Sequence, residues 1–154
     1  FARPATLSVQ LNDLNKIVES VAALVENQAN SQSVKIEKDL QKNLPEVLID
    51  SEQIKQILLN LAINSLQAMP NGGQIAFRTS ENGKFCDVEV EDTGGGIYEK
   101  ILPKIFDPFF TTKEKGVGLG LSIAHKIVNQ HKGTLSVAND SGKTVFSLHL
   151  PKNN

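Results

Sequence analysis

The sequence predicts an α+β domain in which a mostly antiparallel sheet of about five strands is covered on one face by about three helices. Three segments place apolar residues at helical spacing, and several shorter segments alternate apolar and polar residues between turn residues. The chain has 154 residues, of which 40% are hydrophobic and 21% charged, and this suits one globular core. We therefore expect a single domain over residues 1–154.

The first half of the chain is expected to contain two helices. In order, the predicted elements are a short strand before residue 12, a helix with apolar positions from Leu14 to Val25, strands at 34–40 and 44–50, and a helix over 51–69. Asp50 or Ser51 should cap the second helix, because a side-chain oxygen there accepts a hydrogen bond from a free backbone N–H. Pro70 and the two glycines that follow Asn71 should end it.

The second half is expected to supply the rest of the sheet and a third helix. The predicted elements are strands at 74–80 and 85–92, a short helix at 98–102, a helix at 121–131, and a closing hairpin from strands at 133–140 and 142–151. The pair Asn82-Gly83 suits a tight turn between the first two strands. Residues 103–116 contain two prolines and show no period. A long loop of this kind in a compact domain is usually a lid.

Charge and composition exclude several classes of protein. Lysine and arginine number 16 and aspartate and glutamate 17, so a net charge of -1 gives no bulk attraction for nucleic acid or anionic membranes. No apolar run is long enough for a membrane span and no signal peptide is recognisable, so we expect a soluble, cytoplasmic domain. The single Cys86 excludes a disulfide framework and a structural zinc site, and it should be a small core residue. Because the chain begins at Phe1, we expect a fragment whose upstream part is missing.

Three glycines in "KEKGVGLGLSIAHKIV", at positions 116, 118 and 120, precede an apolar helical pattern. A dinucleotide-binding fingerprint would need glycine where Leu121 stands, and a P-loop would need lysine and a hydroxyl residue after its last glycine. Backbone N–H groups at the start of a helix attract an anion, and glycines let a phosphate approach closely. Taken alone, the stretch fits either a phosphate site or a flexible hinge before a helix.

Polar side chains follow one flank of the predicted helix over 51–69. At about 100° per residue, Asn60, Asn64 and Gln67 fall together, and Asn64 points nearly the same way as the core residue Ile57. A buried amide without a partner costs about 1–3 kcal/mol. Asn64 is therefore expected either to make a structural hydrogen bond to a neighbouring strand or to present its carbonyl oxygen to a hard cation. Mg²⁺ fits the second role, because it takes its other ligands from water and substrate phosphates.

Asp92 is a carboxylate that the strand pattern turns toward the core. In "FCDVEVED" apolar and acidic residues alternate, and Asp92 continues the inward-facing set. Two roles fit this position. It can cap the turn at the glycines that follow, or it can accept a hydrogen bond from an amino group of a ligand held between helices and sheet. The exocyclic amine of adenine fits the second role, because an ionised carboxylate only accepts and therefore disfavours a guanine carbonyl.

Four ordered motifs resemble those of the ATP-binding catalytic domain of sensor histidine kinases, within the superfamily that includes DNA gyrase, the MutL repair proteins and a heat-shock chaperone. The resemblance covers nearly the whole chain. The similar stretches are the asparagine box "QILLNLAINSLQAM", the first glycine box "EDTGGGI", the phenylalanine box "IFDPFFTTK" and the second glycine box "GVGLGL". The resemblance implies a two-layer α/β sandwich of Bergerat type that holds ATP between helices and sheet. It also implies an ATP lid over 97–116 and, over 1–5, the end of a linker from an upstream phosphoacceptor domain.

The resemblance further implies residue roles. Asn64 matches the family's Mg²⁺-binding asparagine, with Asn60 as a second contributor, and Asp92 matches the carboxylate that reads adenine. The lid lysines Lys113 and Lys115 would by default be solvated charges. Because the bulk charge gives no attraction for phosphate and Gln67 is neutral, we expect one of them, with Lys113 preferred, to reach the γ-phosphate, and with Asn60 and Asn64 it should serve catalysis. Gln67 replaces a basic residue, so it can hydrogen-bond the phosphates but cannot neutralise them. The other expected ATP-binding residues are Gly94, Gly96 and Ile97 in the first glycine box, Gly116, Gly118, Leu119, Gly120 and Leu121 at the second, and Thr144 at the pocket rim.

The resemblance favours a kinase over a hydrolase. The gyrase and MutL branches carry a water-activating glutamate four residues before the metal-binding asparagine, where this chain has Asn60, and an amide is no general base. We therefore expect transfer of the γ-phosphoryl group to a histidine on a separate dimerisation and phosphotransfer domain, with a response regulator receiver domain as a further partner. His125, His131 and His149 should be surface or packing residues, because none is followed by an acidic residue as the family's phosphoacceptor is.

Two other interpretations stay open. A nucleotide-dependent interaction module would bind ATP, move its lid and transfer nothing, and it would share all of these motifs. A serine-directed kinase of the same superfamily is less favoured. Its members resemble the hydrolases in carrying the glutamate that Asn60 replaces here.

Overall fold

The structure of the chain, a computed structural model, describes residues 7–96 and 117–152. Its elements follow the order β1 (Gln10–Asn12), α1 (Leu14–Ser31), β2 (Val34–Leu40), β3 (Val47–Ile49), α2 (Ser51–Gln67), β4 (Gly73–Asn82), β5 (Phe85–Asp92), α3 (Val117–Gln130), β6 (Thr134–Asp140) and β7 (Lys143–Pro151). The expected lid at 97–116, the short helix at 98–102 and the linker end at 1–5 lie outside the described residues.

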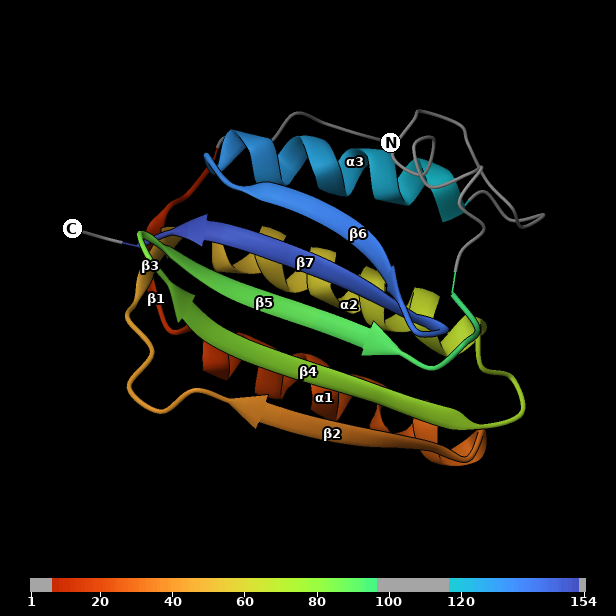
Figure 1. Cartoon of the computed structure of the whole chain (residues 1–154). Coiled ribbons are helices and arrows are strands. Elements are labelled where there is room, and N and C mark those ends of the chain that lie inside the picture. Colours follow the sequence, from red (N-terminus) through yellow and green to blue (C-terminus); the bar gives the residue numbers. More distant parts are fainter. Residues whose placement is uncertain (1–6, 97–116, 153–154) are drawn as a thin grey trace.

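Five strands form one mixed sheet in the order β2-β4-β5-β7-β6 (Figure 1). β2 and β4 pair in parallel, and the other neighbours in this sheet pair antiparallel. The prediction of a mostly antiparallel sheet of about five strands is therefore confirmed. β1 and β3 form a separate two-stranded sheet. β3 begins later than the predicted strand at 44–50, and Pro45, which lacks a donor N–H, precedes it.

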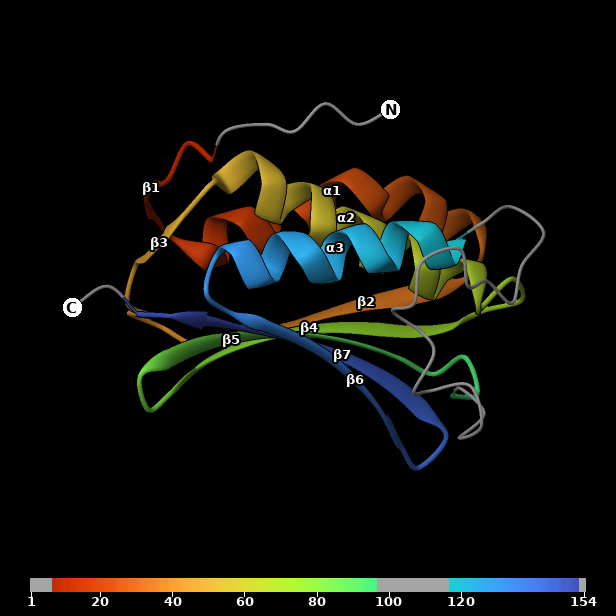
Figure 2. The same ribbon diagram turned by 90° about the horizontal axis from the view of Figure 1, so that it is seen from above.

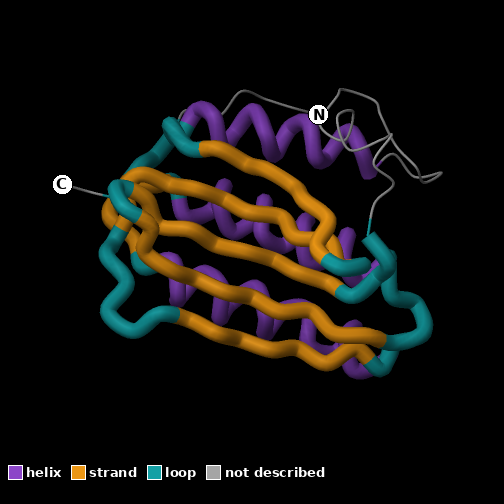
Figure 3. The backbone as a smooth tube through the Cα atoms, viewed as in Figure 1, coloured by secondary structure: helices purple, strands orange, loops and turns teal. Residues whose placement is uncertain are grey.

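Helices α1, α2 and α3 cover one face of the five-stranded sheet, and the view from above in Figure 2 separates the two layers. Figure 3 shows the same division by type of element. The inward-facing side chains of β4, β5 and β7 pack against the helices in one core. Its largest fully buried residues include Phe77, Phe146, Ile54, Ile57, Leu58, Leu61, Ile75, Leu148 and Leu150. Among the described helices, none is long and apolar enough to cross a membrane.

Each of the first two helices starts at an aspartate cap. The Asp13 carboxylate accepts a hydrogen bond from the Asn15 N–H at 2.9 Å, and Asp50 accepts one from the Gln53 N–H at 3.3 Å. Of the two caps considered for the second helix, Asp50 is therefore the one that the structure uses. The aspartates satisfy backbone donors that have no partner within the helix.

Three element boundaries differ from the prediction. α2 ends at Gln67 rather than at residue 69, and the exposed Ala68 is its C-cap. Asn82 pairs with Phe85, so the turn between β4 and β5 is centred on Gly83 and the following lysine, with a φ of 61° at Gly83. α3 begins at Val117, four residues earlier than the predicted start at 121. Glycine disfavours a helix by about 1 kcal/mol relative to alanine, but Gly118 and Gly120 are nevertheless part of the helix.

Cys86 and the three histidines have the structural roles expected of them. Cys86 is fully buried, and burial raises the pKa of its thiol. His131 is buried, its Nε2 accepts from the Asp50 N–H at 3.1 Å, and its Nδ1–H donates to the Ile127 carbonyl at 2.9 Å. His149 lies 2.6 Å from a carboxylate oxygen of Asp87. His125 is half-buried on α3.

Candidate functional site

Asp92 is the buried carboxylate around which the candidate site is described. It is the last residue of β5 and is only 3% exposed, so the strand pattern predicted its inward direction correctly. One of its oxygens, Oδ1, accepts a hydrogen bond from the Gly94 N–H at 2.9 Å. The turn-capping role considered for Asp92 is therefore confirmed. It does not compete with ligand binding, because a carboxylate offers about four lone pairs on two oxygens.

The sheet register sets the neighbours of Asp92. Ile75 lies opposite it on β4 and Thr144 lies opposite it on β7, and both are buried. Asn139 on β6 lies opposite Thr144 in turn, which extends the row toward the edge of the sheet. Thr144 was expected at the pocket rim, and the structure places it directly beside Asp92. Asn139 was not among the predicted site residues, although the hairpin register around "NDSG" could have placed it opposite Thr144.

The first glycine box packs against the end of α2. A Cβ on Gly94 would lie 2.7 Å from the Ala68 Cβ and 2.9 Å from Oδ1 of Asp92, so glycine alone fits there. Gly96 has a φ of 81°, and a Cβ on it would lie 3.1 Å from Oδ1 of Asn139. The box is therefore held between the C-terminal end of α2 and the turn of the β6–β7 hairpin.

The amide strip lies on the second half of α2. Asn64 is half-buried, whereas Asn60 and Gln67 are exposed, with Gln67 as the last residue of the helix. The Asn60 carbonyl oxygen accepts a hydrogen bond from the Gln56 side chain at 3.2 Å, one turn earlier in the helix. The strip thus follows one flank of α2, as its spacing predicted, and it leads toward the end that meets Gly94.

The second glycine box forms the first turn of α3. Gly118, Leu119 and Gly120 lie within that turn, and Leu121 has a buried side chain, so only its backbone can meet a phosphate. In Figure 1 the start of α3, the end of α2, the end of β5 and the β6–β7 turn lie at the same side of the molecule. Motifs that are far apart in the sequence thus meet in one region. Ile97, Lys113 and Gly116 are outside the described residues.

Charged residues of β4, β5 and β7 pair with one another on the face of the sheet opposite to Asp92. Nη2 of Arg78 lies 2.6 Å from a carboxylate oxygen of Glu91, and Nε of Arg78 lies 3.1 Å from a carboxylate oxygen of Glu89. Nζ of Lys143 lies 3.5 Å from the other carboxylate oxygen of Glu91. The hydrogen bond to Glu91 raises the pKa of the Arg78 guanidinium. Burial alone would raise the pKa of Glu91, but Arg78 and Lys143 hold that pKa below its ordinary value. These charges stabilise the outer face and do not enter the site.

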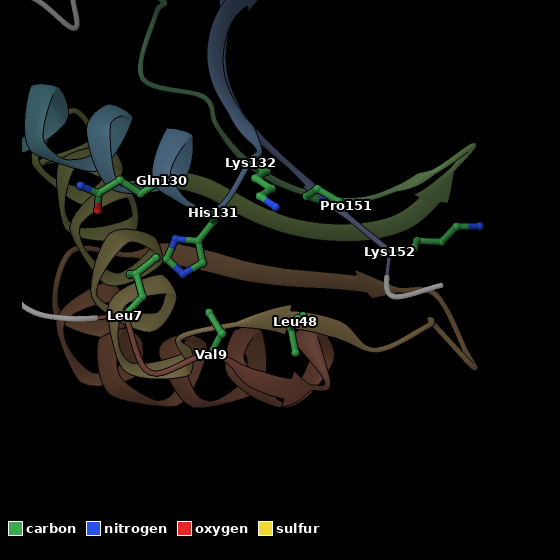
Figure 4. A pocket seen from close by; sticks show the side chains of 8 residues that line it. All are labelled: Leu7, Val9, Leu48, Gln130, His131, Lys132, Pro151 and Lys152. Atoms are coloured by element: carbon green, nitrogen blue, oxygen red, sulfur yellow. The ribbon is translucent and has the colours of Figure 1, made fainter.

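A pocket of about 330 Å³ at the other end of the molecule is not part of this region (Figure 4). Its lining includes the apolar side chains of Leu7, Val9, Leu48 and Pro151. Pro151 lies opposite the first residue of β5, whereas Asp92 is the last. At about 3.3 Å per residue, the length of β5 separates the two by roughly 23 Å. None of the predicted site residues that the structure describes lines this pocket.

A family model for histidine kinase-, DNA gyrase B- and HSP90-like ATPases matches residues 49–154. The chain is 41% identical to the sensor histidine kinase ZraS of Escherichia coli over 154 residues, or 99% of the chain. It is 38% identical to sporulation kinase A of Bacillus subtilis over 141 residues, or 91% of the chain. It spans 33% of the length of the first relative and 23% of the second.

Solved structures of relatives have the same two-layer fold. The nucleotide-free catalytic domain of histidine kinase ThkA superimposes with a TM-score of 0.87 at 32% identity, over 94% of this chain and 96% of that one. Full-length ShkA in complex with AMPPNP gives a TM-score of 0.87 at 28% identity, over 99% of this chain and 33% of that one. ThkA in complex with the response regulator TrrA gives a TM-score of 0.84 at 30% identity, over 96% of this chain and 42% of that one. The predicted fold class is therefore confirmed.

Proposed function

Because the chain belongs to the family of histidine kinase-, DNA gyrase B- and HSP90-like ATPases, as a catalytic domain of the sensor histidine kinase type, we propose that it binds Mg-ATP and phosphorylates a histidine. That histidine belongs to a separate dimerisation and phosphotransfer domain. The observation that carries the proposal is the buried Asp92 at the end of β5, between Thr144 and the backbone of Gly94. Such a transfer needs cytoplasmic ATP, so the cytoplasm is the proposed location.

Asp92 supplies what an adenine ring requires. Its ionised carboxylate can only accept, so it pairs with the exocyclic amine of adenine and repels the carbonyl that guanine carries there. Gly94 packs closely against Ala68 and Asp92, and Gly96 lies near Asn139. Because neither glycine carries a side chain, the backbone of this segment can approach a flat base closely. Thr144 offers a hydroxyl next to Asp92, and Ile97 would close the glycine box.

The proposed phosphate site lies between α2 and the start of α3. The first-turn N–H groups at Gly118, Leu119 and Gly120, with Gly116 and Leu121 at either side, attract the phosphates. Gln67 at the end of α2 would add a neutral hydrogen bond, and Lys113 would reach the γ-phosphate.

The residues present fit a magnesium ion that is shared with the nucleotide. Among the described residues, no group of three or more His, Cys, Asp or Glu side chains could hold a metal by itself. Mg²⁺ would therefore take its ligands from Asn64, with Asn60 as second contributor, from water and from phosphate oxygens. When bound, the ion neutralises charge on the transferred group. Asn64 is half-buried and lies in the last turn of α2, beside the end of the helix that meets Gly94.

Phosphoryl transfer suits this set of residues better than hydrolysis does. An imidazole nitrogen of the acceptor forms the new N–P bond while the bond from the γ-phosphorus to the β–γ bridging oxygen breaks, and ADP leaves. The acceptor brings its own nucleophile, so the protein needs no general base, and Asn60 supplies none. ThkA is in complex with the response regulator TrrA. By analogy, we propose a response regulator receiver domain as the recipient of the phosphoryl group.

The kinase proposal is tested by mixing the domain with Mg-ATP and a fragment that carries the phosphoacceptor histidine. The expected product is acid-labile phosphate on the fragment. ATP binding without transfer would favour the alternative, a nucleotide-dependent interaction module. Acid-stable phosphoserine on the fragment would point instead to a serine-directed kinase.

Replacement of Asp92 tests the base site directly. Asp92→Asn keeps the shape of the side chain but replaces one accepting carboxylate oxygen with a donating NH₂ group. A hydrogen bond to a charged group contributes about 1.5–3 kcal/mol, so affinity for ADP should fall roughly 10- to 100-fold. The matched control is Asp87→Asn, a buried carboxylate on the opposite face of the same strand. It should leave ADP affinity unchanged, as measured by calorimetry. Equal losses in both variants would remove Asp92 from the base site.

A further inference from the structure

Ser65 on α2 has a hydroxyl that nothing in the described structure satisfies. The residue is 0% exposed, and its Oγ has no hydrogen-bond partner among the described residues. A serine within a helix commonly donates to the carbonyl four residues earlier, and Ser65 does not. A buried hydroxyl without a partner costs about 1–3 kcal/mol. Native proteins keep such a group where a water or a ligand provides the missing partner.

Ser65 lies where the proposed nucleotide site meets the core. It precedes Ala68 by three residues, which places the two on the same side of the helix, one turn apart. Ala68 and Oδ1 of Asp92 both lie next to Gly94, because a Cβ on Gly94 would be within 3 Å of each of them. Ser65 is thus one turn further into the core from the corner that Asp92 and Gly94 form.

Its neighbours offer no alternative role for the hydroxyl. Leu61, one turn earlier on the same face, and Leu66 are fully buried apolar residues. The other buried side-chain atom without a partner in the described part of the chain is Oε1 of Gln53. Gln53 is half-buried in the first turn of α2, at the end of the helix away from Asp92, where its long side chain can rotate toward water. Ser65 is fully buried and its short side chain cannot reach solvent. A hydrogen-bond partner for its hydroxyl must therefore be a water or ligand that enters the site.

We propose that Ser65 is a second base-reading residue, whose hydroxyl hydrogen-bonds adenine, directly or through one ordered water, on the edge that Asp92 reads. The proposal rests on the proposed function and deepens it. Asp92 accepts from the exocyclic amine, and Ser65 donates to the adjacent ring nitrogen N1. Together they read the donor and acceptor pair that distinguishes adenine from guanine.

We expect the Ser65→Ala substitution to weaken ADP binding without lowering the stability of the nucleotide-free domain. Loss of one neutral hydrogen bond should weaken ADP binding roughly two- to tenfold. The midpoint of urea unfolding without nucleotide should stay the same or rise, because an unsatisfied buried hydroxyl is removed. The control is Thr79→Val, because Thr79 is also buried but its Oγ1 donates to Asn15 at 2.6 Å and accepts from the Gln41 N–H at 3.0 Å. This variant should lose stability and keep its ADP affinity.

A base analogue separates a contact with adenine from an indirect effect of packing. 1-Deazaadenosine has a C–H in place of N1. The unsubstituted chain should bind it two- to tenfold more weakly than adenosine, whereas Ser65→Ala should bind both equally. The same discrimination in both proteins, or equal ADP affinity in both, would overturn the role of Ser65. If the unsubstituted chain bound neither adenosine nor ADP, the proposed function would fail instead. The catalytic domain of ThkA, which matches this chain over 94% of its length, was solved by itself, so the experiment uses the chain of 154 residues without further domains.

Discussion

Three buried aspartates show that burial alone does not identify a functional carboxylate. Asp50 caps α2 and accepts a hydrogen bond from the Ser8 N–H at 3.0 Å, so it joins the start of the described chain to a helix. Asp87 is paired with His149 on the outer face of the sheet. Asp92 instead lies at a strand end beside close-packed glycine. The surroundings of each carboxylate, rather than its depth, indicate its role.

Asn64 should control the magnesium-dependent part of nucleotide binding. Asn64→Ala removes the carbonyl oxygen proposed as an Mg²⁺ ligand and leaves the base site intact. The affinity for ATP without Mg²⁺ should therefore stay unchanged, while the gain in affinity on adding Mg²⁺ should largely disappear. Titrations with and without Mg²⁺ check this. An unsubstituted chain that binds ATP equally well in both conditions would contradict the role given to Asn64.

Glu91 should contribute to acid sensitivity. Its folded-state pKa is lowered, so the stabilisation is complete above the unfolded pKa of about 4.3 and is lost as pH falls through the folded pKa. Glu91→Gln keeps the shape but cannot ionise. The difference in unfolding free energy between the two proteins should be constant above about pH 5. It should shrink steadily below that, as measured by urea unfolding at several pH values. A difference that is the same at every pH would show that the Arg78 and Lys143 contacts do not act through charge.

At the scale of elements, the alternating residues of β5 contribute to both faces of the sheet. Its inward residues build the core and end at Asp92, while its outward residues Asp87, Glu89 and Glu91 pair with His149, Arg78 and Lys143. β5 is the central strand of the five, with β4 and β7 as its neighbours. A strand bonded on both sides holds a side chain at its end more rigidly than a loop does.

The start of α3 should distinguish phosphates from the rest of the nucleotide. Replacing Gly118 and Gly120 with alanine adds Cβ atoms to the first turn of the helix. Affinity for ADP and ATP should fall more than affinity for adenosine, because the proposed site brings only the phosphates close to that backbone. Alanine favours a helix over glycine by about 1 kcal/mol, so poorer folding is not the expected cause. If adenosine binding falls equally, the two glycines are structural.

At the scale of the whole molecule, His131 joins three distant parts of the chain. It connects the C-terminal end of α3 to the start of α2 through the Ile127 carbonyl and the Asp50 N–H, and Asp50 in turn holds Ser8. These bonds use both ring nitrogens in the neutral form. The region lies at the end of the sheet away from Asp92, beside the pocket of Leu7 and Leu48. The hydrogen-bonded cluster around His131 and the proposed nucleotide site therefore lie at opposite ends of the same helix layer.

His131→Ala tests this separation. The variant leaves the Asp50 N–H without its acceptor and creates a cavity, so the free energy of unfolding should fall by about 2–4 kcal/mol. ADP affinity of the folded fraction should stay unchanged. His125→Ala, on the half-buried face of α3, is the control and should change stability by less than about 1 kcal/mol. A large loss of ADP affinity in His131→Ala would mean that the two ends of the layer are coupled.

The sequence by itself determined the kinds of elements, their order and the four motifs, and it turned Asp92 toward the core. These features follow from periodicity and turn chemistry, which act over a few residues. Only the tertiary structure decided that β1 and β3 form their own sheet, that Thr144 stands beside Asp92, that Ala68 closes on Gly94, and that Ser65 has no partner. Strand register and hydrogen-bond satisfaction depend on residues tens of positions apart, and no local pattern specifies which of them will meet.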